Sequence, residues 1–109
     1  MAAEPLRQWR RPVYPVAFGA AAAIAGIAPR AAMVSYLHAF CANLVSAALR
    51  LMPIGQSDGL GCLAHLSKML PALADALDLT PFDDIGAAAL TVDFCSMRHE
   101  TQYTRLFRS

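Results

Sequence analysis

The sequence predicts an all-α protein, a helical bundle of four to five helices. Apolar residues recur every three to four positions over several segments, as they do along one face of an α-helix. No alternation of apolar and polar residues, the pattern of a half-buried strand, extends beyond a few positions. Proline and glycine fall between the periodic segments and divide the chain into separate helices.

The N-terminal part begins with a polar stretch and continues into a segment of small residues. Residues 1–12 contain two prolines and predict a flexible lead-in. A helix is predicted over residues 15–28, because proline is favoured in a first helical turn. Pro29 is expected to end this helix and to open the next. Small residues that would let another helix approach closely are Gly19, Ala23 and Gly26.

The next segment is the most apolar of the chain. Residues 31–49 carry no formal charge, and about 20 apolar residues suffice to cross a bilayer. A small membrane protein with two spans, 13–28 and 31–49, is therefore an alternative. His38 and Asn43 would be costly near a bilayer centre, and the connection between the spans would be short and charged. These observations favour the core helix of a soluble protein.

A break follows at residues 51–59, where one proline and two glycines occur, and Ser57 or Asp58 could cap the helix after it. The leucines of that helix are spaced alternately by three and four, which predicts an amphipathic face. Pro71 lies among them and predicts a kink or short break near Leu70. The leucines concerned are Leu63, Leu66, Leu70, Leu73 and Leu77.

A last helix is predicted from Thr80, which could serve as N-cap with Pro81 at the first helical position. The next two acidic residues, Asp83 and Asp84, would interact favourably with the positive N-terminal end of the helix dipole. A helical stripe follows through Ile85, Ala88 or Ala89, Val92, and Cys95 or Ser96.

Composition points to a membrane, to a partner or to a missing part of the fold. Hydrophobic residues make up 57% of the 109 residues and charged residues only 16%, so the chain carries more apolar surface than a small domain easily buries. Eight of the nine basic residues are arginine, a type suited to protein interfaces. The net charge of +1 lacks the basic balance of a nucleic-acid-binding protein.

The cysteines and histidines do not define a catalytic or metal site. Three cysteines in apolar settings are expected to be reduced and buried, as in a cytosolic protein. Three Cys–His pairs at helical spacing each supply only two ligands, so packing is favoured over metal binding. No nucleophile elbow, phosphate-binding loop or carboxylate pair is present, and an enzyme is not expected. The pairs are His38 with Cys41, Cys62 with His65, and Cys95 with His99.

The C-terminal tail interleaves aromatic and basic residues. Disordered tails are usually poor in aromatics, whereas tyrosine and arginine dominate interface hot spots, so composition leaves docking and disorder equally open. If the tail were helical, positions 99, 103, 106 and 107 would share one face.

Three blocks, in order along the chain, together resemble the UreF family of urease accessory proteins. They are residues 14–19 (Tyr-Pro-Val-Ala-Phe-Gly), residues 43–56 (from Asn43-Leu44-Val45-Ser46 to Ile54-Gly55-Gln56) and residues 97–109, which close on Arg-Leu-Phe-Arg-Ser. Family members are markedly longer, and their N-terminal half is absent here. The resemblance therefore implies a bundle that is incomplete relative to the family fold, with a helical part at 13–97 and a partner-docking tail at 98–109.

The resemblance also implies a function. UreF proteins are cytoplasmic, dimerise, bind the accessory protein UreD (also called UreH), recruit the GTPase UreG and help to load apo-urease with nickel. Nickel is then the cargo of the complex, and no cofactor, nucleic acid or membrane is expected on this chain. The implied UreD-binding residues are Arg98, His99, Glu100, Gln102, Tyr103, Arg105, Leu106, Phe107, Arg108 and Ser109, with Arg50 and Gln56 as a second element.

Overall fold

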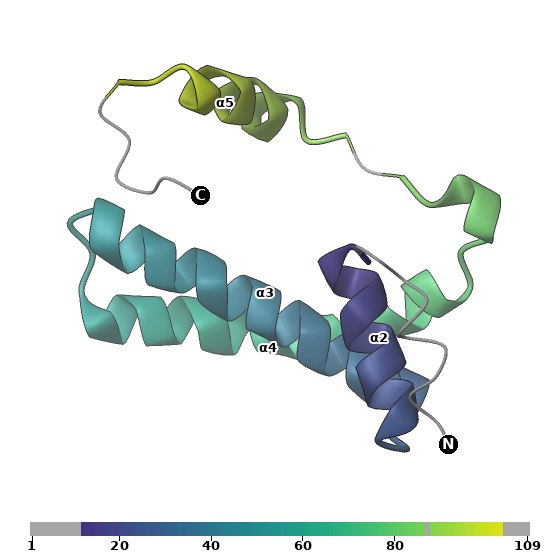
Figure 1. The fold of residues 1–109 in the computed structure, drawn as a ribbon. Coiled ribbons are helices and arrows are strands. Elements are labelled where there is room, and N and C mark those ends of the chain that lie inside the picture. Colours follow the sequence, from purple (N-terminus) through teal and green to yellow (C-terminus); the bar gives the residue numbers. More distant parts are fainter. Residues whose placement is uncertain (1–11, 87, 104–109) are drawn as a thin grey trace. The chain divides into compact units, whose positions relative to one another are not determined.

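The structure, a computed structural model, describes residues 12–86 and 88–103, and its regular elements in this part of the chain are all helical. The α-helices are α2 (Tyr14–Ile24), α3 (Pro29–Leu51), α4 (Gln56–Asp78) and α5 (Leu90–Glu100), with one 3₁₀ turn, η1 (Phe82–Asp84) (Figure 1). The predicted all-α class is confirmed. Of the predicted lead-in 1–12, only Pro12 lies within the described residues.

The chain forms two units, Met1–Leu79 and Thr80–Ser109. The first contains α2, α3 and α4, and the second contains η1 and α5. The division proposed from the sequence after residue 97 concerns function and stays a prediction.

The end of α2 is set by a glycine. Gly26 has φ of +71°, a conformation that residues with a Cβ rarely adopt. The amide of Ile27 donates to the carbonyl of Ala22 at 3.0 Å, and that of Gly26 donates to Ala23 at 3.1 Å. This pair of bonds is the Schellman motif, which satisfies the last carbonyls of a helix. Helix α2 therefore ends before the predicted residue 28, and Gly26 serves the turn rather than a close helix approach.

Pro29 opens α3, as predicted, and α3 and α4 lie side by side and antiparallel (Figure 1). The predicted cap of α4 is wrong: Gly55 is the N-cap, without a side-chain bond, and Ser57 and Asp58 already belong to the first turn. In this first turn, the carboxylate of Asp58 still interacts favourably with the positive end of the helix dipole. Gly59 lets the two helices come close near the turn, since a Cβ on it would lie 2.9 Å from the side chain of Leu49.

Helix α4 runs through Pro71 without a break, so the predicted short break is wrong. Proline has no N–H and removes the helical bond that position 71 would donate to the carbonyl of Ser67. The residues on either side along the buried face, Leu70 and Ala74, are only 4% and 1% exposed. Their burial against the rest of the unit stabilises the helical conformation of α4 on both sides of the missing hydrogen bond.

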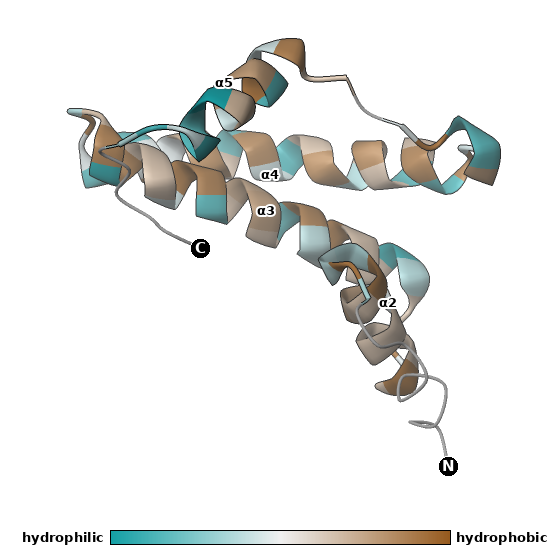
Figure 2. Cartoon of the chain, turned by 45° about the horizontal axis from the view of Figure 1, so that its top comes forward, coloured by the Kyte–Doolittle hydropathy of each residue, from teal (hydrophilic) through white to brown (hydrophobic). Residues whose placement is uncertain are grey.

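The first unit buries few of its hydrophobic side chains. Among the described residues, the buried hydrophobic side chains are Ala22, Ala32, Leu70 and Ala74, and only leucine among these is large. Figure 2 shows α2 as a predominantly hydrophobic ribbon, whereas α3 and α4 both alternate between hydrophobic and hydrophilic positions. The exposed large hydrophobics of this unit are Val13, Tyr14, Val16, Ile24, Ile27, Phe40, Leu44, Leu51, Met52, Ile54, Leu60, Met69, Leu73, Leu77 and Leu79.

In the second unit the predicted helix from Thr80 is wrong. Pro81 precedes a single 3₁₀ turn, Ile85 is extended, and α5 begins only at Leu90. Glycine at position 86 weakens a helix by about 1 kcal/mol, and here the chain leaves the helical conformation around it. The predicted stripe from Ile85 to Cys95 is therefore not one helical face.

By length and composition, one helix in the described ranges could cross a membrane: α3, Pro29–Leu51, with 6% of its most apolar window buried. Helix α2 has 11 residues and so extends about 16 Å, against the roughly 30 Å of a bilayer core. In the two-span alternative, the helix within the first span (residues 13–28) is therefore too short to cross a bilayer.

Candidate functional site

The described part of the predicted docking tail begins on the last turn of α5. Arg98, His99 and Glu100 are helical, and the amide of Gln102 donates to the carbonyl of His99 at 3.2 Å just beyond the helix end. Tyr103 follows in a turn and is 93% exposed. Because α5 ends at Glu100, the predicted helical face shared by positions 99 and 103 does not form. The remaining predicted tail residues, Arg105, Leu106, Phe107, Arg108 and Ser109, lie outside the described residues.

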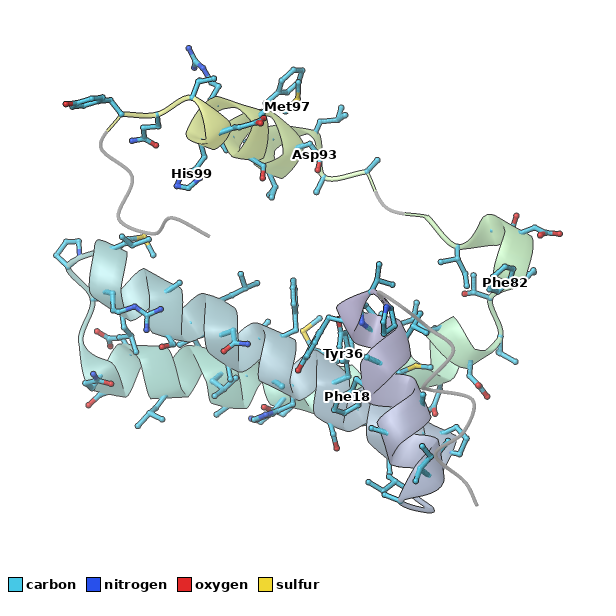
Figure 3. All side chains as sticks on the ribbon, viewed as in Figure 1. Phe18, Tyr36, Phe82, Asp93, Met97 and His99 are labelled. Carbon is cyan, nitrogen blue, oxygen red and sulfur yellow. The ribbon has the colours of Figure 1, made fainter. Side chains whose placement is uncertain are left out.

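Helix α5 also presents an apolar stripe that leads toward this tail. Leu90, Phe94 and Met97 stand at helical spacing of four and three and are 68%, 64% and 67% exposed. The side chains of Met97 and His99 project from different sides of α5 (Figure 3). This spacing is visible in the sequence, but a helix that begins at Thr80 predicts a different apolar face, through Ile85 and Val92.

Arg50 and Gln56 lie in the first unit, at the tip of the α3–α4 hairpin. Arg50 is in the last turn of α3 and donates from Nη1 to Ser46 Oγ at 2.8 Å. Gln56 is the first residue of α4 and is exposed. Both residues of the predicted second docking element therefore lie at the same end of the hairpin.

At the other end of the hairpin, Arg30 and Asp75 form a bidentate ion pair. Arg30 Nε lies 2.5 Å from Asp75 Oδ1, and Nη2 lies 3.0 Å from Oδ2. The hydrogen bond from Arg30 lowers the pKa of the Asp75 carboxyl, although both side chains are more than half exposed. The pair joins the start of α3 to the end of α4. Sequence reasoning missed it, because it depends on the register of the two helices.

An apolar groove lies between α2 and α3. The ring of Tyr36 on α3 packs against those of Phe18, at 5.3 Å between centroids, and Tyr14, at 5.9 Å, both on α2 (Figure 3). Beside these rings is a hollow of about 340 Å³. Its lining residues are Pro15, Phe18, Gly19, Ala22, Ala23, Ile27, Pro29, Ala32, Met33 and Tyr36.

The cysteines are less buried than the sequence predicts. Cys62 and Cys95 are exposed and Cys41 is half-buried, so the expected burial is wrong for the first two. The reason is that α4 and α5 have few neighbours to cover their outer faces. Within the described ranges, no three or more His, Cys, Asp or Glu side chains gather where they could hold a metal ion.

The chain belongs to a family of accessory proteins, the UreF family. Its family model, described as UreF, matches residues 1–67. The urease accessory protein UreF of Methylorubrum populi is 50% identical over 99 residues, which are 91% of this chain and 44% of that protein. The corresponding proteins of Methylobacterium sp. strain 4-46 and Granulibacter bethesdensis are both 53% identical, over 88% and 89% of this chain and 38% and 41% of their own lengths. No solved structure matches.

This chain thus spans about two fifths of the length of the curated relatives that it matches, and it corresponds to their C-terminal part. The similarity to the relatives extends over 96 to 99 residues, well beyond the stretch that the family model covers. The resemblance stated from the sequence is therefore confirmed at the level of the family.

Proposed function

We propose that this chain is a non-catalytic scaffold of urease maturation, the C-terminal part of a UreF-type protein that acts in the cytoplasm. In this role it binds UreD (UreH), helps to recruit the GTPase UreG, and so promotes delivery of nickel to apo-urease. Nickel is the cargo of the complex, and this chain holds no cofactor of its own. The observation that carries the proposal is the identity of about 50% to proteins named urease accessory protein UreF.

The proposed UreD-docking element is the segment 98–109. Its described residues support this role, because Tyr103 is 93% exposed and Arg98 lies five residues before it, in the last turn of α5. Tyrosine and arginine are the types that most often anchor an interface. The apolar stripe of Leu90, Phe94 and Met97 leads toward the same segment. On binding, we expect Tyr103 and Phe107 to bury apolar area and Arg105 to pair with a carboxylate.

The hairpin tip with Arg50 and Gln56 is a second, weaker contact in this proposal. Dimerisation and UreG recruitment are expected of the full-length protein. The large exposed apolar surface of the first unit supports a protein that works inside an assembly.

The test is capture of UreD by a hybrid in which this chain follows the N-terminal part of the Methylorubrum populi relative. Deleting residues 98–109 should abolish capture while helical content hardly changes. Tyr103→Ala and Phe107→Ala should each weaken capture more than tenfold, since a buried aromatic anchor commonly contributes about 2 kcal/mol or more. The matched control is Phe82→Ala, an aromatic residue 87% exposed outside the segment, which should leave capture unchanged. Wild-type capture by the deletion variant would show that the docking element lies elsewhere.

One observation favours a second candidate, a membrane-associated helical protein: α3 is apolar and long enough to span a bilayer. Against this candidate, α3 packs along α4, which carries Asp58, Lys68, Asp75 and Asp78. Membrane fractionation separates the two functions, because only the second places the chain in the membrane pellet under high salt.

A further inference from the structure

The groove between α2 and α3 is shaped for an apolar element. All of its lining side chains are hydrophobic or small, and the one side-chain polar atom among them is the hydroxyl of Tyr36. Small-molecule sites combine apolar walls with several convergent polar groups that orient the ligand, and this lining offers only one side chain of that kind. An amphipathic helix, in contrast, needs only an apolar groove to receive its hydrophobic face.

We propose that this groove is the docking surface for an apolar helix from the N-terminal part of the UreF polypeptide. The relatives carry this part: the matched stretch occupies 44% of the Methylorubrum populi protein and 38% of the Methylobacterium one, and it is their C-terminal part. The additional length of a relative therefore precedes the matched stretch and leads into the fold at α2. Helix α2 is the first described helix and forms one wall of the groove.

The poor core of the first unit points to the same occupant. Leu70 is its one large buried hydrophobic side chain in the described ranges, whereas Val16, Ile24 and Ile27 on and beside α2 are 44–48% exposed. A helix laid along the groove would cover the rings of Phe18 and Tyr36 and the apolar side chains next to them. Burial of this apolar surface is the driving force for docking.

A glycine on the groove wall allows a clean test. A Cβ on Gly19 would meet no atom within 4 Å, so a side chain added at this position begins in open space on the groove wall. Leucine is also a better helix former than glycine, so Gly19→Leu should preserve α2 while it fills the space that the incoming helix needs. Gly61 on α4 is the matched control, because a Cβ there also meets nothing within 4 Å and Gly61 does not line the groove.

The experiment co-expresses the tagged 109-residue chain with a separate polypeptide, the part of the Methylorubrum populi UreF protein that precedes the matched stretch. The wild-type chain and Gly61→Leu should capture this polypeptide equally. Gly19→Leu should reduce capture about tenfold or more, because overpacking opposes close helix contact. Ala23→Leu, at a second lining position, should act in the same direction, and circular dichroism should show unchanged helical content in all variants.

Three results would overturn the proposal. The first is equal capture by the wild-type chain and both groove variants. The second is a dimer of the chain alone that becomes a monomer in Gly19→Leu while the N-terminal polypeptide is not captured, which would make a second copy the occupant. The third is capture only after removal of residues 80–109, which would make the C-terminal unit of the same chain the occupant. None of these results depends on UreD, so the proposal stands or falls separately from the docking role of the tail.

Discussion

Two glycines near the start of α4 should respond differently to the same substitution. A Cβ added to Gly59 would lie 2.9 Å from both Cδ atoms of Leu49 and 3.1 Å from its Cγ. A Cβ added to Gly61, two positions further on, would meet no atom within 4 Å. Alanine at these two positions therefore isolates the close contact between α3 and α4 from the intrinsic preference for helix.

The expected magnitudes follow from these contacts. Gly61→Ala should stabilise the helical hairpin by about 1 kcal/mol, the usual difference between alanine and glycine inside a helix. Gly59→Ala gains a similar amount but forces the Leu49 side chain to move, and overpacking of this kind costs roughly 1–3 kcal/mol. The net effect at Gly59 is then between no change and a loss of about 2 kcal/mol.

The assay is urea unfolding of the full chain at low protein concentration, followed by far-ultraviolet circular dichroism. Comparison of the two variants cancels effects that glycine-to-alanine changes share in the unfolded chain. If Gly59→Ala raises the free energy of unfolding as much as Gly61→Ala, the close packing of α4 on Leu49 is refuted.

Three further predictions concern the ion pair, metal binding and solubility. Because Arg30 lowers the pKa of Asp75 below its ordinary 3.8, the pair stabilises the hairpin in full above that pH and loses this effect as the pH falls through the lowered pKa. Asp75→Asn should therefore be less stable than the wild type near neutral pH, with a difference that shrinks in high salt and disappears in strong acid; a difference that persists in acid would refute the electrostatic origin. Equilibrium dialysis should show no stoichiometric nickel site that Cys62→Ala or Cys95→Ala abolishes, and such a loss in either variant would contradict the assignment of these residues. The isolated chain should aggregate, because it exposes large apolar surface, and co-expression of the N-terminal part of a relative should raise its soluble yield; a monomer with a sharp melt and no binding of a hydrophobic dye would be contrary evidence.

Local signals in the sequence predicted much of the helical fold. Pro29 marks the start of α3 because proline fits only the first turn of a helix, and the Pro-Gly cluster after Leu51 marks the hairpin turn. The same rule failed at Pro71, where burial of Leu70 and Ala74 outweighs one lost backbone bond. It also failed at Pro81, because the short run before Gly86 has no buried face to sustain a helix.

The site was less accessible to sequence reasoning, because its contacts join distant positions. The Arg30–Asp75 pair depends on the antiparallel register of α3 and α4, which the hairpin turn at residues 52–55 fixes. The groove depends on how α2 crosses α3, and only Gly19 and Ala23 signalled in advance that a close approach was possible there. The docking tail, in contrast, followed from the resemblance of residues 97–109 to the family, and its role stays a prediction.

The most direct test of the central claim is the nickel content of urease. A host that lacks its own UreF would express urease, the other accessory proteins, and a hybrid that joins the N-terminal part of the Methylorubrum populi relative to this chain. We expect that urease purified from this host contains nickel, and that deletion of residues 98–109 from the hybrid leaves the urease nearly free of nickel. Nickel-free urease in the presence of a soluble, helical, intact hybrid would contradict the claim that this chain serves nickel insertion.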